Sequence, residues 1–249
     1  MGTFSRRVRP VASVDDSGTS RRGEAVAPKA RLAVFDYDGT IISAQSGTQF
    51  TKYLLLNGYI SPLSALKVIL WGARYTLHLP HDQAAVRGYL VNDLDRLTRA
   101  QILEIMGRFH DDVLTRFYRP AALEQVRACR EDGCVCVLVS ATFHGIAQAA
   151  ARHIGMDAFL ATRMAVNGEG HMTGAVDGEV VEGAGKCRAV TRWADGRFGP
   201  DNWVVEYAFG DHHSDEEMLS LARHPYAVDP GRSLRSVAKR RGWPVLLWE

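Results

Sequence analysis

The sequence predicts an α/β protein with a Rossmann-like, doubly wound parallel sheet and an inserted small α-helical cap domain. Three observations carry this prediction. Short apolar runs alternate with helical patterns in the second half of the chain, polar residues follow several of these runs, and one long block is helical throughout. The expected division is a disordered tail at 1–30, an α/β core at 31–45 and 117–249, and a helical cap at 46–116.

The composition fits an enzyme-sized globular protein. With 249 residues, 46% hydrophobic and 23% charged, the chain can bury one sizeable core and carry an inserted domain. A net charge of +2 gives no field that would attract nucleic acid, so no nucleic-acid partner is expected. The sequence carries no information on oligomeric state.

The cysteines and the apolar stretches indicate where the protein resides. The four cysteines lack zinc-finger spacing and are expected as free thiols in the reducing cytoplasm. The longest apolar stretch, 53–79, is interrupted by polar, charged and proline residues, whereas a spanning helix needs about 20 consecutive apolar residues. Neither a transmembrane segment nor membrane association is therefore expected.

The N-terminal region predicts a tail followed by a buried strand. Residues 1–30 contain arginine pairs, serine, glycine and proline but no apolar run that could form a signal-peptide core. Order is expected from Arg31, where the apolar run 32–35 leads directly into the turn DYDGT. A short apolar run that ends in a glycine-containing turn is typical of a strand buried on both faces.

The block 46–116 has the periodicity of helices. Apolar residues recur at spacings of three and four, as at Ile102, Leu103, Ile105, Met106 and Phe109. This apolar stripe favours the packing core of a cap over a lipid-binding surface.

Helices and strands alternate after the cap. Pro120 suits the first position of a helix, and Asp132 with Gly133 closes that helix before an apolar strand. The expected helices are 120–130, 143–154, 185–194 and 215–222, and the expected strands are 134–139, one within 158–165, 204–209 and 226–228. This alternation predicts a parallel sheet with helices on both faces.

Polar residues follow the predicted strands at the sheet edge where α/β proteins bind ligands. Asp36 and Asp38 follow the first strand, and Ser140 and Thr142 follow the strand 134–139. Taken singly, each feature has an ordinary alternative. Asp-x-Asp-Gly also occurs in calcium loops and turns, and a serine or threonine before a helix is commonly a cap. Lys186, after Gly185, could be a solvated surface lysine.

The segment FGDHHSDEEML gives a stronger signal. Asp211 follows the strand 204–209 and Asp215 begins a helix, where acidic residues also stabilise the helix dipole. His212 and His213 suggest zinc, but adjacent side chains point apart. Carboxylate oxygens from Asp36 and Asp211 instead favour a hard cation such as Mg²⁺.

In the order DYDGT, SAT, Lys186, GDHHSD, the motifs resemble the haloacid dehalogenase (HAD) superfamily, and within it the phosphoserine-phosphatase-like subfamily IB. That branch carries a helical cap soon after its first motif, which matches 46–116. The resemblance covers residues 31–249 and implies an HAD-type hydrolase acting on phosphoric monoesters.

The resemblance also implies roles for individual residues. Asp36 would attack phosphorus to form an aspartyl-phosphate, and Asp38 would act as acid and then as base. Mg²⁺ would be held by Asp36, the backbone carbonyl of Asp38, Asp211 and Asp215. The groups that would bind the phosphoryl oxygens are Gly39, Thr40, Ser140, Ala141 and Lys186.

The substrate is expected to be a small phosphorylated metabolite. Phosphoserine phosphatases carry an acidic residue nine positions after the nucleophile, where this chain has Gln45, and they usually carry Asn where it has Ser214. A neutral amide cannot pair with the substrate ammonium group, so phosphoserine itself is not expected. The alternatives are a phosphotransferase, a lipid-phosphate phosphatase and a non-catalytic phosphate-binding module.

Overall fold

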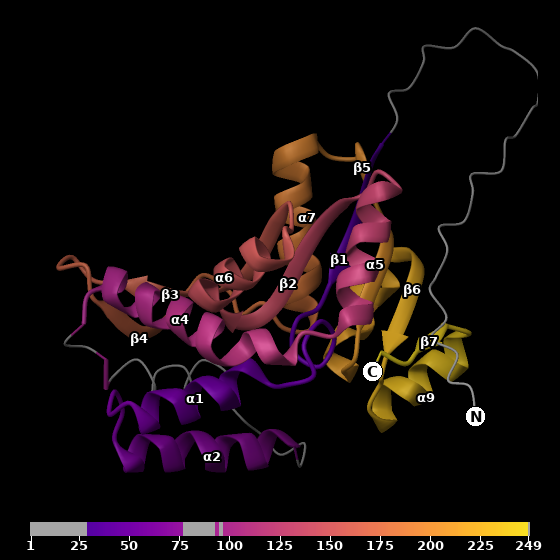
Figure 1. The fold of residues 1–249 in the computed structure, drawn as a ribbon. Coiled ribbons are helices and arrows are strands. Elements are labelled where there is room, and N and C mark those ends of the chain that lie inside the picture. Colours follow the sequence, from indigo (N-terminus) through magenta and orange to yellow (C-terminus); the bar gives the residue numbers. More distant parts are fainter. Residues whose placement is uncertain (1–28, 77–92, 95–96, 249) are drawn as a thin grey trace, which may run out of the picture.

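Seven strands form one sheet in the order β4-β3-β2-β1-β5-β6-β7 in the computed structural model, which describes residues 29–76, 93–94 and 97–248 (Figure 1). All neighbouring pairs are parallel except β3 and β4. The strands are β1 (Ala30–Phe35), β2 (Val135–Phe143), β3 (Ala158–Val166), β4 (Met172–Asp177), β5 (Trp203–Gly210), β6 (Ala222–Val228) and β7 (Val245–Leu246). The predicted doubly wound α/β fold is confirmed.

The central strands are apolar on both faces because each face packs against helices. In β1, Leu32 and Val34 belong to the apolar cluster on one side, and Ala33 and Phe35 to the cluster on the other. Phe35 stacks on Phe209 of β5, with ring centroids 4.6 Å apart. The strand order reverses around β1, so the carboxyl ends of β1 and β5 form the switch point where such sheets bind ligands.

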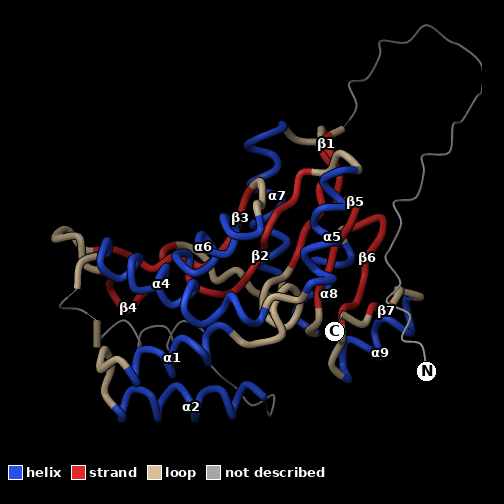
Figure 2. Tube along the Cα trace, viewed as in Figure 1, coloured by secondary structure: helices blue, strands red, loops and turns tan. Residues whose placement is uncertain are grey.

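Helices cover both faces of the sheet, as Figure 2 shows. The cluster around Phe35 includes apolar residues of α4 (Arg99–Val113), α5 (Pro120–Glu131) and α6 (His144–Ile154). The cluster around Leu32 includes residues of α7 (Ala184–Phe198), α8 (Glu216–Ser220) and α9 (Arg232–Arg241). The sheet is therefore shielded from solvent on both sides, as a parallel sheet requires.

Several element boundaries differ from the sequence prediction. The strand expected at 134–139 continues to Phe143, because a register irregularity lets Phe143 pair with Thr162 of β3. The helix expected at 215–222 is a short 3₁₀-helix, η2 (His213–Asp215), followed by α8, which ends at Ser220. The last predicted strand begins four residues earlier, at Ala222, because β6 tolerates Pro225 within it.

The described part of the predicted cap block contains helices. They are α1 (Ser46–Leu56), α2 (Pro62–Thr76), α4 and the 3₁₀-helix η1 (Leu114–Phe117). Phe50 of α1 and Phe109 of α4 belong to the same apolar cluster as Phe35 of β1, so the block shares a core with the sheet. Its treatment as a separate domain stays a prediction.

The two chain segments that join this block to the sheet lie side by side. Ile42 pairs with Tyr118 in an antiparallel bridge. The Ser43 N–H donates to the Phe117 carbonyl at 2.9 Å, and the Arg119 N–H donates to the Ile41 carbonyl at 3.0 Å. The chain therefore leaves and re-enters the core at one place.

Three further sequence predictions concern cysteines, membrane spans and the tail. All four cysteines are free thiols, as predicted, and Cys129, Cys134 and Cys136 are buried. Within the described residues, no helix combines the length and hydropathy of a membrane span. The tail predicted at 1–30 lies outside the described residues except for its last two positions.

Candidate active site

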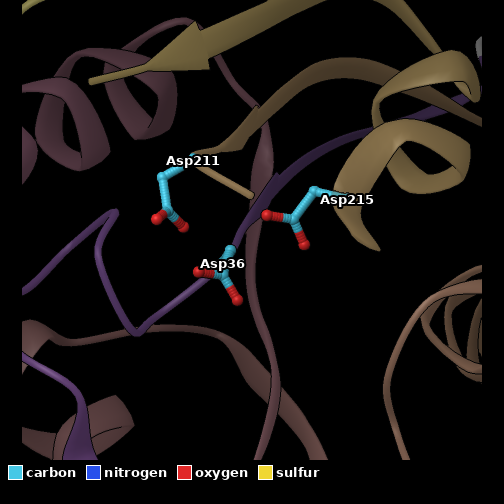
Figure 3. Close-up of side chains that lie close together, drawn as sticks. All are labelled: Asp36, Asp211 and Asp215. Carbon is cyan, nitrogen blue, oxygen red and sulfur yellow. The ribbon is translucent and has the colours of Figure 1, made fainter. Parts of the chain in front are cut away.

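Three aspartates from separate segments meet at the carboxyl ends of β1 and β5 (Figure 3). Asp36 follows β1, Asp211 follows β5, and Asp215 ends η2. One carboxylate oxygen from each lies within 4.8 Å of the others. Asp36 is 5% exposed and Asp215 only 1%. The strand ends thus gather three acidic groups, of which Asp36 and Asp215 are buried and Asp211 is half-buried.

Lys186 lies among these carboxylates. It is 3% exposed, and its Nζ donates to Asp36 Oδ1 at 2.5 Å and to Asp215 Oδ1 at 2.6 Å. Burial by itself would lower the pKa of Lys186, but Asp215 and Asp36 raise it above its ordinary value, so the amine stays charged. The sequence alternative of a solvated surface lysine is therefore wrong.

One lysine does not neutralise three carboxylates. Burial raises the pKa of Asp36, against the attraction of Lys186 and with the repulsion of Asp215. Burial also raises the pKa of Asp211, and repulsion from Asp36 and Asp215 adds to the rise. The cluster therefore favours an added positive charge, either protons or a cation.

The ligands in this cluster fit Mg²⁺. All three are carboxylates, the oxygen donors that hard divalent cations prefer. Among the described residues, no histidine or cysteine belongs to a group that could hold a metal ion. The Nδ1 of His212 instead lies 3.0 Å from Ser214 Oγ. The chemistry of the donor set therefore fits a hard divalent cation.

Two glycines allow the acidic segments to approach one another. Gly39 has φ of +83°, and a Cβ there would lie 2.2 Å from Asp211 Oδ2. A Cβ on Gly210 would lie 2.7 Å from the Cβ of Asp215. Next to Gly39, the Thr40 hydroxyl donates to Asp211 Oδ1 at 3.3 Å. The position of Asp211 therefore depends on the absence of a side chain at residue 39.

The side chain of Asp38 is held outside this cluster. Its Oδ1 accepts from the Ser46 N–H at 2.5 Å and its Oδ2 from the Ser46 hydroxyl at 2.8 Å. Burial raises the pKa of Asp38 to about 6, although both bonds from Ser46 lower it. The metal contact predicted for its backbone carbonyl stays a prediction.

Ser46 was not singled out from the sequence. It begins α1, and the Thr142 hydroxyl near the end of β2 lies 2.8 Å from its own hydroxyl. Since the Ser46 hydroxyl donates to Asp38, the Thr142 hydroxyl donates to Ser46. Thr142 and Ser46 thus position Asp38. The available signal was a serine at the start of the predicted cap block.

Ser140 lies at the same edge of the sheet as the carboxylates. It is 1% exposed, and its Oγ accepts a hydrogen bond from the Thr142 N–H at 3.1 Å. β2 and β1 are parallel neighbours, with Leu138 opposite Phe35, so Ser140 and Asp36 follow paired positions. The half-buried Ala141 lies between Ser140 and Thr142. The phosphate-binding roles predicted for Gly39, Thr40, Ser140 and Ala141 stay predictions.

Comparisons with known proteins show similarity to one enzyme family. The family model of haloacid dehalogenase-like hydrolases matches residues 33–220. A probable phosphatase of Mycobacterium tuberculosis is 33% identical over 231 residues, which cover 88% of this chain and 76% of that protein. A phosphoserine phosphatase of the same bacterium is 28% identical over 216 residues, which cover 86% and 69%. A crystal structure from Bordetella pertussis has a TM-score of 0.78 at 25% identity and covers 88% of this chain and 98% of that one.

Proposed function

The chain belongs to the haloacid dehalogenase-like hydrolases and is a phosphatase of that family, and we propose that it hydrolyses a small phosphomonoester with Mg²⁺ through an aspartyl-phosphate at Asp36. One observation carries the proposal. The Nζ of Lys186 bridges Asp36 and Asp215, and an oxygen of Asp211 lies within 4.8 Å of both carboxylates. Phosphoryl transfer needs this combination of a nucleophile with positive charge beside it.

The chemistry of the chain's own groups follows two steps. A carboxylate oxygen of Asp36 forms a bond to phosphorus while the bond from phosphorus to the leaving oxygen breaks, and Asp38 gives that oxygen a proton. Asp38 then takes a proton from water, whose oxygen attacks phosphorus and breaks the bond to Asp36. Inorganic phosphate leaves, and both aspartates return to their starting states. A pKa of about 6 lets Asp38 both give and accept a proton near neutral pH.

Charge explains why the partners are needed. A carboxylate about 4 Å from a phosphate charge is repelled by roughly 4 kcal/mol for each unit-charge pair at an effective dielectric of 20. The ammonium group of Lys186 offsets part of this repulsion at Asp36. Mg²⁺, when held by Asp36, Asp211, Asp215 and the backbone carbonyl of Asp38, would supply further positive charge to the phosphoryl oxygens.

The proposed substrate is a small phosphorylated metabolite other than phosphoserine. Gln45 is exposed and directly precedes α1, and it carries no charge that could pair with an ammonium group. Although one relative is named a phosphoserine phosphatase, it shares only 28% identity with this chain. We also propose a cytoplasmic location. Phosphorylated metabolites are polar solutes, and free thiols such as the four cysteines persist in reducing compartments.

Phosphate release measured with and without Mg²⁺ tests the proposal. An aryl phosphate and a panel of phosphometabolites, including phosphoserine and lipid phosphates, serve as substrates. Turnover should require Mg²⁺ and should be lost in Asp36→Asn, while the exposed Asp112→Asn serves as the matched control and stays active. Absence of phosphate release across the panel, together with no beryllofluoride-stabilised complex, would contradict the proposal.

Product analysis separates hydrolysis from transfer to another acceptor. When alcohols are added to the reaction, inorganic phosphate should remain the product of every turnover. A phosphorylated alcohol as the main product would identify a phosphotransferase. Tight phosphate binding without turnover would instead identify a binding module.

A further inference from the structure

A cavity lies away from the three aspartates. It measures about 420 Å³ and is lined by the start of α4, the junction of β2 and α6, and the strands β3 and β4. Figure 1 shows these four segments together on the side of the molecule opposite β6 and β7. The volume lies within the range of sites that bind small molecules. Its lining includes none of the carboxylates or Lys186 of the candidate active site.

One part of the cavity wall is apolar and adaptable. Met106 of α4, Phe143 of β2, Met164 of β3 and Met172 of β4 all line it, and all four are buried. Methionine side chains have flexible, polarizable thioethers that adjust to irregular apolar shapes. This wall therefore suits the apolar body of a small organic ligand.

The rim of the cavity is basic. Arg99 comes from α4, Arg163 from β3 and His144 from the start of α6, so three separate elements place basic groups around one opening. Within the part of the chain that the structure describes, neither guanidinium has a carboxylate oxygen within 4.0 Å. One acidic residue, Asp177, also lines the cavity and lies opposite Arg163 in the antiparallel register of β3 and β4.

The positive charge of the rim reaches into the cavity. Burial lowers the pKa of His144, and the charges of Arg163 and Arg99 lower it further. Both arginines are exposed and have no ion pair among the described residues, so their guanidinium groups can donate hydrogen bonds to an anionic group at the opening. An anion bound between Arg99 and Arg163 would supply a partner for both.

We propose that this cavity binds a small organic anion, with its apolar body against the methionine wall and its carboxylate, sulfonate or phosphate group between Arg99 and Arg163. The site is distinct from the phosphoryl-transfer site, so the inference does not depend on the proposed function. Asp177 limits the ligand to one compact anionic group on the Arg163 side, because a second negative charge there would meet a carboxylate.

Two probes of the same shape test the charge. Isothermal titration calorimetry compares naphthalene-1-sulfonate, which has an apolar body and one anionic group, with the neutral naphthalene-1-methanol. The sulfonate should bind at least about tenfold more tightly, since hydrogen bonds to a charged group are the stronger ones. Equal affinity of the two probes, or no binding of the sulfonate to the folded protein, overturns the proposal.

Three variants locate the binding. The double variant Arg99→Ala/Arg163→Ala should abolish the preference for the sulfonate, and Ala165→Phe, which places a ring in the cavity, should weaken both probes. The matched control is Arg127→Ala, because Arg127 is an exposed arginine on α5. Circular dichroism verifies the fold of each variant. Unchanged binding of the sulfonate to Ala165→Phe, or loss of the preference in Arg127→Ala, would place the site elsewhere.

Discussion

Replacing Gly39 by alanine should disable the active site while costing the fold little. Two effects act at this position. The backbone has φ of +83°, which costs a residue with a side chain about 1–2 kcal/mol. The new Cβ would also lie 2.2 Å from Asp211 Oδ2, whereas real Cβ contacts essentially never fall below 3.0 Å, so Asp211 or its loop has to move about 0.8 Å.

The two effects can be separated by a second glycine. Gly133, in the turn between α5 and β2, has φ of +78° but nothing within 4 Å of an added Cβ. Gly133→Ala therefore carries only the backbone cost, which corresponds to a Tm lower by about 2–8 °C for a chain of this size. Gly39→Ala carries that cost and the displacement as well. A misplacement near 1 Å in a catalytic site lowers the rate about 100-fold.

Thermal unfolding and Mg²⁺-dependent phosphate release measure the two costs. Both variants should show a similar loss of Tm, while only Gly39→Ala should lose activity by about 100-fold and bind Mg²⁺ more weakly. The reasoning fails if Gly39→Ala keeps activity near that of Gly133→Ala, because the contact with Asp211 would then have no consequence.

Three further predictions concern the charged groups. In Ser46→Ala the loss of a hydroxyl donor raises the pKa of Asp38 above about 6. The limb of the pH-rate profile that Asp38 governs should therefore move to higher pH. Ser43→Ala is the control, and an unchanged profile in Ser46→Ala would contradict the role of Ser46. Lys186→Met removes the ammonium group that pairs with Asp36 and Asp215. The kcat for an aryl phosphate at saturating Mg²⁺ should therefore fall by about 10²–10³-fold. A fall of less than threefold would be inconsistent with the place of Lys186 beside Asp36. In the absence of a metal ion, the folded protein holds protons on carboxylates such as Asp211, whose pKa is raised above the ordinary value of about 3.9. Unfolding returns the pKa to its ordinary value and releases these protons. The free energy of unfolding should therefore fall as the pH rises from about 4 through the raised pKa of Asp211. Denaturant titrations with a chelator should show a shallower fall in Asp211→Asn, and an equal slope in both proteins would exclude this linkage.

The sheet and the meeting of its strand ends could be predicted because they follow from periodic patterns. Apolar runs such as 32–35 show buried parallel strands, and the carboxyl ends of parallel strands lie at one edge. Asp36 and Asp211 each follow such a run directly. Their proximity therefore follows from fold class and order along the chain, without any knowledge of side-chain contacts.

The strands that were missed or predicted too short have weak local signals. β4 is a six-residue edge strand whose partner, β3, is the only antiparallel neighbour among the described strands. β7 has two residues, and Pro225 within β6 resembles a strand break. These strands are defined by pairing with neighbours that are distant in sequence, which a local pattern cannot show.

The contact of Ser46 with Asp38 could not be predicted for a similar reason. It depends on how the first turn of α1 is placed over the loop after β1, and therefore on packing between the inserted helices and the sheet. The cavity beside Arg99 and Arg163 has the same origin, since its walls come from four separate segments. Sequence patterns locate the strand ends, whereas these features arise from tertiary packing.

The hydrogen bonds from Ser46 to Asp38 couple the position of helix α1 to the position of the proposed acid. Asp38, the proposed proton donor, is hydrogen-bonded to the first residue of α1, whereas Asp36, the proposed nucleophile, directly follows β1 and accepts a hydrogen bond from Lys186 of α7. Displacement of α1 from the sheet would break the two hydrogen bonds that position Asp38, while Asp36 would keep its place at the end of β1. In the proposed mechanism, the enzyme would then keep its nucleophile but lack a positioned acid, so a poorly fitting phosphate ester would leave without being hydrolysed.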